Sequence, residues 1–212
     1  AVDPDADRLA IVDENGTALG EEYTLVVAAD GYITSTNKSD EKFVINLSTS
    51  MALEKLASKI GIGVERSAVG EINVVNKMND LNSNFGGEGN GGVILRESHL
   101  GRDSLVAATL VLNRMAQSNE TLNSIFNSLP QYKIIKDKIL IESVNSDKLL
   151  DEVDYLFQDA EKSTVDGIKF TWNDKWIHLR KSNTEPIMRI YSEARTEKLA
   201  QDLVNSVKNL IN

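Results

Sequence analysis

Hydrophobic positions up to residue 129 alternate between short apolar runs and longer stretches in which apolar residues recur every three or four positions. Short runs bounded by turn residues are typical of buried strands, and the longer spacing is typical of helices with one buried face. The expected strands are 9–12, 43–47, 63–66 and 93–95, and the expected helices are 21–33, 51–60, 71–78, 102–117 and 121–129. Because strands and helices alternate, this segment predicts an α/β domain with a mixed or wholly parallel sheet.

Two of these helices carry specific local signals. Ser50 precedes the helix 51–60 as an expected N-cap, and Gly61 follows it as an expected stop. In the helix 71–78, the spacing of Ile72, Val75 and Met78 predicts that these three side chains share the buried face.

The pattern changes at Pro130, which ends the short helix before it and marks an expected domain boundary. The elements expected beyond it are a strand at 132–141, a helix at 148–160, strands at 167–172, 175–180 and 187–193, and a helix at 197–211. Three strands close together predict an antiparallel sheet backed by two helices, an α+β domain. The helix 148–160 is expected to bury Leu149, Val153, Leu156 and Phe157.

Composition narrows the classes of function. The 212 residues carry a net charge of -9, which argues against nucleic acid as a partner because phosphate backbones are bound by basic surfaces. The absence of cysteine excludes disulfides, thiolate metal sites and cysteine nucleophiles. No apolar run approaches the roughly 20 residues of a membrane span, and no signal peptide is apparent, so we expect a cytoplasmic protein without a membrane partner. The chain begins at Ala1 without an initiator Met, as expected of a piece of a longer protein.

An acidic motif opens the chain. Asp3, Asp5 and Asp7 alternate with other residues, so their carboxylates can converge on one side of a loop. Carboxylate oxygens without nearby histidine or cysteine suit a hard cation such as Mg²⁺. A solvated acidic loop is the alternative. An EF-hand is excluded, because its sixth position requires glycine where this chain has Arg8, and an apolar run occupies the middle of the loop.

A glycine-rich motif spans residues 86–92. Its glycines permit close approach of a ligand, and Glu88 and Asn90 offer the hydrogen-bonding groups that suit sugar hydroxyls. A flexible turn between strands is the alternative interpretation. Neither a P-loop nor a dinucleotide-binding fingerprint occurs, so nucleotide binding has little support.

A third motif, residues 180–189, gathers guanidinium, hydroxyl and amide groups into a strand–loop–strand segment. In a chain of net charge -9, the cluster of Arg180, Lys181 and Arg189 departs from the average composition and suits a phosphate group. A plain polar hairpin with its turn fixed by Pro186 is the alternative.

Taken in this order, the three motifs resemble those of the α-D-phosphohexomutase superfamily, which includes phosphoglucomutases, phosphomannomutases and phosphoglucosamine mutases. In that family a D-x-D-x-D-R loop holds Mg²⁺, a G-E-x-S/N-G loop contacts the sugar, and an R-x-S-N/G-T-E-P-x-x-R loop binds the phosphate that does not react. The resemblance implies Asp3, Asp5 and Asp7 as metal ligands, Arg8 as a contact to the transferring phosphoryl group, Glu88 and Asn90 as sugar contacts, and Arg180, Ser182, Asn183, Thr184 and Arg189 as phosphate contacts.

The resemblance also implies a domain division. Residues 1–17 would be the tail of a second domain carrying the metal loop, 18–129 the sugar-binding α/β domain, and 130–212 the phosphate-binding α+β domain. Family members interconvert hexose or hexosamine 6-phosphates and 1-phosphates through a phosphoserine and a bisphosphosugar intermediate. No phosphoserine loop occurs in this sequence, so we expect the chain alone to be inactive and its partners to be a hexose or hexosamine phosphate and the missing N-terminal domains.

Details of the motifs favour one branch of the family. Asn90, Gly92 and the Gly-Arg-Asp sequence at 101–103 make the chain most similar to the phosphoglucosamine mutase-like branch. Phosphomannomutase or phosphoglucomutase remains the alternative within the family. Outside it, the alternatives are a non-catalytic phosphosugar-binding module and an α/β scaffold whose loops match by chance.

Overall fold

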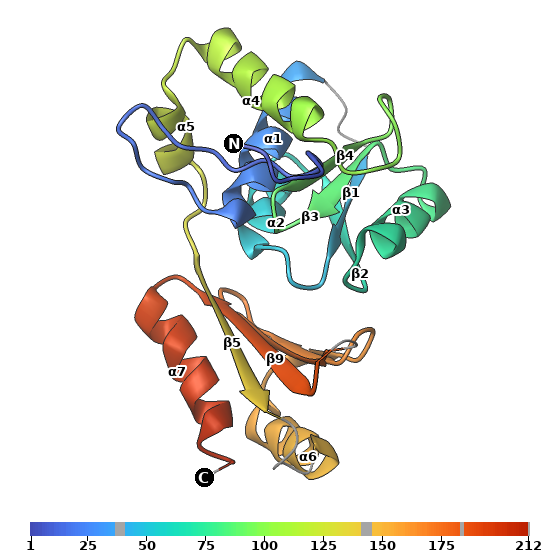
Figure 1. Ribbon diagram of the computed structural model, residues 1–212, viewed down its shortest axis with the longest axis vertical. Coiled ribbons are helices and arrows are strands. Elements are labelled where there is room, and N and C mark those ends of the chain that lie inside the picture. The colour runs from blue at the N-terminus through green and yellow to red at the C-terminus, as the bar shows by residue number, and fades with distance from the viewer. Residues whose placement is uncertain (37–40, 141–145, 183–184, 212) are drawn as a thin grey trace. The chain divides into compact units, whose positions relative to one another are not determined.

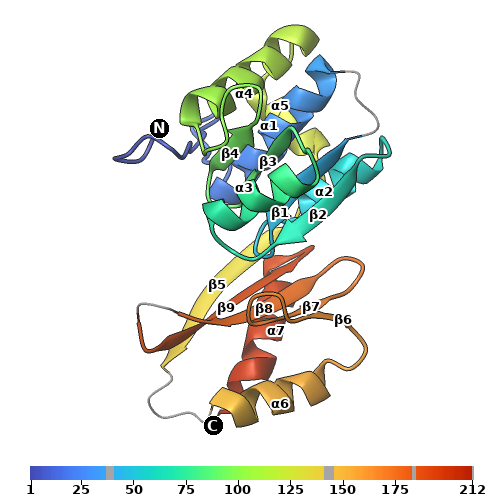
Figure 2. The same cartoon turned by 90° about the vertical axis from the view of Figure 1, so that its right-hand side faces the viewer.

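The computed structural model describes residues 1–36, 41–140, 146–182 and 185–211. The chain divides into two compact units, Ala1–Gln131 (unit 1) and Tyr132–Asn212 (unit 2), which are drawn in Figure 1 and Figure 2. None of the helices in these described ranges has both the length and the apolar composition needed to cross a membrane, and the expected cytoplasmic location stays a prediction.

Unit 1 is built on a four-stranded sheet with the strand order β2-β1-β3-β4. Its elements are α1 (Glu21–Ser35), β1 (Lys42–Asn46), α2 (Met51–Ser58), β2 (Gly63–Ser67), α3 (Glu71–Asp80), β3 (Phe85–Glu88), β4 (Gly92–Leu95), α4 (Ser104–Ser118) and α5 (Leu122–Ser128). Strand β1 runs parallel to β2 and β3, whereas β3 and β4 are antiparallel. The predicted α/β domain with a mixed sheet is confirmed.

The core of unit 1 lies on both sides of this sheet. On one side, Val44 and Ile94 pack against Val74 and Met78 of α3. On the other side, the rings of Tyr32, Phe43 and Phe85 pack together with centroids 4.8 to 5.9 Å apart. Burial of these apolar side chains is the main favourable contribution to the stability of the unit.

The predicted buried face of α3 is partly wrong. Val74 and Met78 are fully buried, whereas Ile72 is 65% exposed. The helix is rotated so that positions four apart, rather than the three predicted residues, face the sheet. Two placements satisfy the spacing equally well, and contact with β1 and β3 decides between them.

Helix starts in unit 1 follow their capping residues. Ser50 accepts a hydrogen bond from the N–H of Ala52, as the sequence predicted. Asp103 accepts from the N–H groups of Leu105 and Val106, so α4 begins at Ser104 rather than at the predicted residue 102. This shift leaves Arg102 in the loop before the helix.

Two further sequence predictions for unit 1 are wrong. Residues 9–12 form isolated bridges instead of a buried strand, and Val12 is exposed, because this segment pairs irregularly with Val2 and Ala18. Conversely, the glycine-rich stretch contributes a strand, β3, that the sequence did not predict. A Cβ at Gly87 would lie 2.3 Å from the carbonyl oxygen of Gly92, so the strand depends on the lack of a side chain there.

Unit 2 is an antiparallel five-stranded sheet with the order β5-β9-β8-β7-β6, which Figure 2 shows from one side. Its elements are β5 (Lys133–Leu140), α6 (Ser146–Leu156), β6 (Glu161–Ser163), β7 (Ile168–Thr171), β8 (Trp176–Lys181), β9 (Ile187–Ala194) and α7 (Glu197–Lys208). The predicted α+β domain is confirmed, with β6 as an additional strand.

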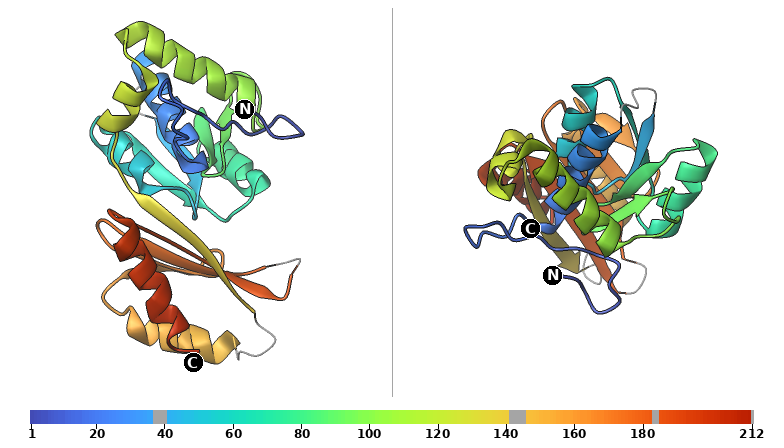
Figure 3. Two further views of the ribbon diagram at one scale, coloured as in Figure 1. Left: turned by 60° about the vertical axis from the view of Figure 1, so that its left-hand side comes forward. Right: turned by 90° about the horizontal axis from the view of Figure 1, so that it is seen from above.

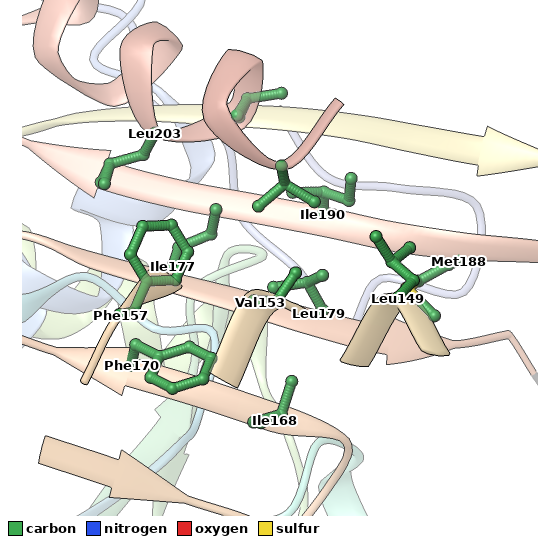
Figure 4. Close-up of a cluster of buried hydrophobic side chains, with 12 residues drawn as sticks. Leu149, Val153, Phe157, Ile168, Phe170, Ile177, Leu179, Met188, Ile190 and Leu203 are labelled. Atoms are coloured by element: carbon green, nitrogen blue, oxygen red, sulfur yellow. The ribbon is translucent and has the colours of Figure 1, made fainter. Parts of the chain in front are cut away.

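One face of this sheet forms the core of unit 2 with both helices. Figure 4 shows Val153 of α6 and Leu203 of α7 against Ile177, Leu179 and Ile190 of the sheet. The predicted inward residues Leu149, Val153 and Phe157 are buried, but Leu156 is exposed because α6 ends there.

Candidate functional site

The three carboxylates of the acidic loop converge. One oxygen from each of Asp3, Asp5 and Asp7 lies within 4.8 Å of the others. The loop bends at Ala6, whose φ of 58° is uncommon for a residue with a side chain and whose N–H donates to the carbonyl of Asp3 at 3.0 Å. Figure 3 shows this blue N-terminal segment beside the green helix α4, where Ser104 donates to the carbonyl of Ala6.

Arg8 lies against two of these carboxylates. Its Nε is 2.6 Å from Oδ2 of Asp3 and 3.5 Å from Oδ1 of Asp7. Burial raises the pKa of Asp3, but hydrogen bonds from the side chain and backbone N–H of Arg8 outweigh this effect and hold the pKa below its ordinary value. The loop is therefore kept ionised at neutral pH.

The donor set of the loop fits a hard divalent cation. All three candidate ligands are carboxylates, and carboxylate oxygens at such spacing suit Mg²⁺. The buried Oδ1 of Asp7 has no hydrogen-bond donor among the described residues. An unsatisfied buried carboxylate oxygen is costly, and a cation beside it would remove that cost.

Glu88, at the end of β3, is buried and surrounded by donors. Its Oε1 accepts from the side chain of Asn46 at 2.7 Å and from the N–H of Gly70 at 2.9 Å. Its Oε2 accepts from Arg102 at 3.0 Å and is 3.5 Å from the amide of Asn90. A carboxylate has about four acceptor positions, so a sugar hydroxyl must replace one of these donors.

Asn90 lies in the turn between β3 and β4 and lines a cavity of about 300 Å³ together with Asp3 and Arg8. The N–H of Leu9 donates to the carbonyl of Gly91 at 3.0 Å and fixes the acidic loop beside this turn. The structure thus brings the acidic loop and the glycine-rich turn to one cavity inside unit 1.

Basic side chains form a row across three strands of unit 2. In the antiparallel register, Arg189 of β9 lies directly opposite Arg180 of β8 on one side and Lys138 of β5 on the other. Directly opposed residues project from the same face of a sheet, which here is the face without the core helices. Like charges placed in this way are destabilising unless an anion lies between them.

The acidic residues near this row offset it only partly. Asp166 is 3.6 Å from Arg180, and Glu185 is 3.4 Å from Arg189. The buried Nε of Arg189 has no acceptor within the described part of the chain. Lys138 and Arg189 also line a cavity of about 330 Å³. These features suit a phosphate group.

The remaining predicted contacts of this loop are less fully placed. The N–H of Ser182 donates to the carbonyl of Ile187 at 2.9 Å and closes the hairpin, whereas Asn183 and Thr184 lie outside the described residues. His178 is next along the same face of β8, and burial lowers its pKa to about 4, so it is neutral at neutral pH.

Sequence reasoning missed two residues of these clusters, Arg102 and Lys138. A signal for Lys138 existed, since the alternation of Lys136 and Lys138 with apolar residues in 133–140 places both lysines on one strand face. Arg102 had no local signal, because the predicted helix start at 102 assigned it to a regular element rather than to a loop.

Comparisons with known proteins agree along the chain. Residues 20–132 match the family description "Phosphoglucomutase/phosphomannomutase, alpha/beta/alpha domain III", and residues 140–210 match "Phosphoglucomutase/phosphomannomutase, C-terminal domain".

Two curated relatives illustrate the similarity. The chain is 31% identical over its whole length to the phosphoglucosamine/phosphogalactosamine mutase of Sulfurisphaera tokodaii, covering 47% of that protein. It is 33% identical over 95% of its length to the phosphoglucomutase/phosphomannomutase of Thermococcus kodakarensis, covering 44% of it. The chain thus spans a little under half the length of these relatives.

Solved structures show the same fold. A phosphoglucomutase/phosphomannomutase family protein from Burkholderia thailandensis superposes with a TM-score of 0.81 at 22% identity, over the whole chain and 47% of that structure. A phosphomannomutase-like protein from Thermus thermophilus, described as putative in its title, gives 0.74 at 22% identity, over the whole chain and 45% of that structure.

Proposed function

Because the chain belongs to the phosphoglucomutase/phosphomannomutase family, we propose that it is the C-terminal part of a phosphohexomutase. The whole enzyme would interconvert the 6-phosphate and 1-phosphate of a hexose or hexosamine. The phosphoryl group would pass from a phosphoserine outside this chain to the sugar, and the bisphosphosugar would return its other phosphoryl group to that serine.

The observation that carries the proposal is the cavity in unit 1 shared by Asp3, Arg8 and Asn90. It joins candidate groups for a cation, a phosphoryl group and a sugar hydroxyl, which a plain solvated loop or a simple glycine turn does not require. The basic row of Arg180, Arg189 and Lys138 adds a second anion-binding cluster in unit 2.

The residues have distinct proposed roles. Asp3, Asp5 and Asp7 would hold Mg²⁺, which neutralises charge on a phosphoryl group during transfer. Arg8 would bind the transferring phosphoryl group, and Asn90 would orient the sugar, with Glu88 as its second contact. Bidentate hydrogen bonds from Arg180 and Arg189 would hold the phosphate that does not react. Ser182, Asn183 and Thr184 would complete the phosphate contacts.

For the substrate, we propose a hexosamine phosphate. The support is the name of the relative from Sulfurisphaera tokodaii, which is aligned over the whole chain, and the phosphoglucosamine mutase of Methanococcus vannielii, which is 30% identical. A mannose or glucose phosphate is the second candidate, supported by the name of the relative from Thermococcus kodakarensis.

We expect the purified chain to bind a hexosamine phosphate without converting it. Binding needs the two candidate clusters, whereas turnover needs a phosphoserine that the sequence does not contain. Calorimetric titration with glucosamine 6-phosphate, mannose 6-phosphate and glucose 6-phosphate measures the preference, and a coupled assay measures turnover. Absence of binding to any of the three would contradict the proposed function, and turnover by the chain would contradict the expected inactivity.

Replacing Asp5 with alanine should weaken Mg²⁺ binding about a hundredfold, since each carboxylate ligand contributes strongly to the affinity for a hard divalent cation. Asp5 is exposed, so its loss should leave the fold unchanged. Titration with Mg²⁺, or with Mn²⁺ followed by electron paramagnetic resonance, measures the affinity. Asp202→Asn on the exposed side of α7 is the control and should bind as the unsubstituted chain does. Equal affinities in both variants would exclude the acidic loop as the cation site.

A further inference from the structure

Arg102 connects the acidic loop to the glycine-rich turn. It lies between β4 and α4, and its side chain is 18% exposed. Its Nη2 is paired with Oδ2 of Asp7, and its Nη1 donates to Oε2 of Glu88 at 3.0 Å. Its Nε is 3.5 Å from Glu71, which also accepts from the backbone N–H of Arg102 at 2.7 Å. One guanidinium therefore contacts three carboxylates from three segments.

The surrounding backbone is shaped to admit this side chain. A Cβ at Gly92 would lie 2.3 Å from Cδ of Arg102, so the glycine leaves room for the arginine stem. Asp103 caps α4 and keeps Arg102 outside the helix. The contact to Asp7 is thus set by two separate features of the sequence.

The contact occupies an oxygen that a cation would also need. Asp7 offers Oδ2 to Arg102, and its Oδ1 is 3.5 Å from Arg8. A guanidinium and a divalent cation repel each other at this distance, and the effective dielectric constant near a half-buried carboxylate is well below that of water. Both cannot be held by Asp7 with full strength at once.

We propose that Arg102 is a positioning residue that joins Asp7 to Glu88 in the cation-free chain and gives up Asp7 when a divalent cation binds. The proposal rests on the proposed cation role of the acidic loop. After release, the guanidinium keeps Glu88 and Glu71 as partners. The occupancy of the cation site and the setting of Glu88 are therefore linked through one side chain.

Arg102→Met tests the proposal, because methionine keeps much of the apolar stem and removes the charge. We expect Mg²⁺ affinity to rise about tenfold, since the cation no longer competes with a guanidinium and neutralises carboxylates left unpaired. Mn²⁺ titration by electron paramagnetic resonance provides the same measurement with a spectroscopic signal. A purely structural role for Arg102 predicts the opposite, because a disordered loop would bind the cation more weakly.

Arg114→Met is the matched control. Arg114 is comparably buried, at 14% exposed, and is paired with Asp30 and Glu120 in the same unit, outside the contacts described for the acidic loop. Its loss should leave cation affinity unchanged. Arg102→Lys serves if Arg102→Met does not fold: a lysine keeps the charge without the fork geometry, and we expect an affinity between those of the other two proteins.

A double-mutant cycle with Glu88→Gln tests the link to the glycine-rich turn. Loss of the Glu88 charge should strengthen the hold of Arg102 on Asp7 and lower cation affinity in the unsubstituted chain, with a much smaller effect in the Arg102→Met background. Unchanged or weaker cation binding in Arg102→Met, or additive effects in the cycle, would overturn the inference alone. Absence of cation binding in every protein would overturn both the inference and the proposed cation site.

Discussion

Replacing Arg180 and Arg189 together with methionine is expected to lower the affinity of the chain for a hexose phosphate by at least about a hundredfold. Each arginine would contribute charge-assisted hydrogen bonds to the phosphate, worth about 1.5–3 kcal/mol apiece. The register places the two guanidinium groups on opposed positions of β8 and β9, so their losses should combine. Calorimetric titration with glucosamine 6-phosphate measures the change.

The same substitution should not harm the fold of unit 2. Arg180 and Arg189 are like charges directly opposite each other, so removing both should leave the melting temperature unchanged or slightly higher. Arg195→Met is the control, because Arg195 stacks on the ring of Tyr132 with its guanidinium carbon 4.2 Å from the centroid, in the same unit but outside the basic row. An unaltered affinity in the double variant would remove the phosphate role from the loop.

The second large effect concerns stability. Arg66→Met is expected to lower the free energy of unfolding of unit 1 by about 3 kcal/mol, because it removes one partner of a buried ion pair. Arg66 donates to both oxygens of Glu54 at 2.8 and 2.9 Å, and its Nη1 donates to the carbonyls of Asn46, Leu47 and Thr49. All of these partners would be left without the guanidinium.

The loop that Arg66 holds also supports the glycine-rich turn. Asn46 donates to Glu88, and Thr49 accepts from the N–H of Gly89 at 3.0 Å. Native-state amide hydrogen exchange should therefore become faster in β1, in β2 and at residues 88–90. The control is Lys42→Met, which breaks the more exposed ion pair of Lys42 with Glu65 on the same two strands and should cost less than about 1 kcal/mol. Similar losses in both variants would contradict the importance assigned to Arg66.

Local signals predicted the element types and the two fold classes well. Ser50 as a cap, the period of α7 and the change of pattern near residue 130 all depend on neighbours in sequence, and the structure contains the corresponding elements. The spacing of the three aspartates correctly predicted that their carboxylates converge. Their role in binding a cation stays a prediction.

Features that depend on distant contacts were predicted poorly. Residues 9–12 are apolar, but strand pairing in the described residues is limited to isolated bridges. Strand β3 was missed because glycine has low strand propensity, although β1 and β4 pair with it on both sides. The saturation of Glu88 by donors from Asn46, Gly70 and Arg102 joins residues up to 42 positions apart, which sequence spacing does not reveal.

The central claim is that the glycine-rich turn and the basic row both bind one phosphorylated sugar. Nuclear magnetic resonance of the ¹⁵N-labelled chain, titrated with glucosamine 6-phosphate in the presence of Mg²⁺, tests it most directly. We expect amide signals near Asn90 and near Arg180 and Arg189 to shift together with one affinity, and glucosamine without phosphate to leave the basic row unaffected. Shifts confined to other parts of the chain, or equal shifts with the unphosphorylated sugar, would contradict the account.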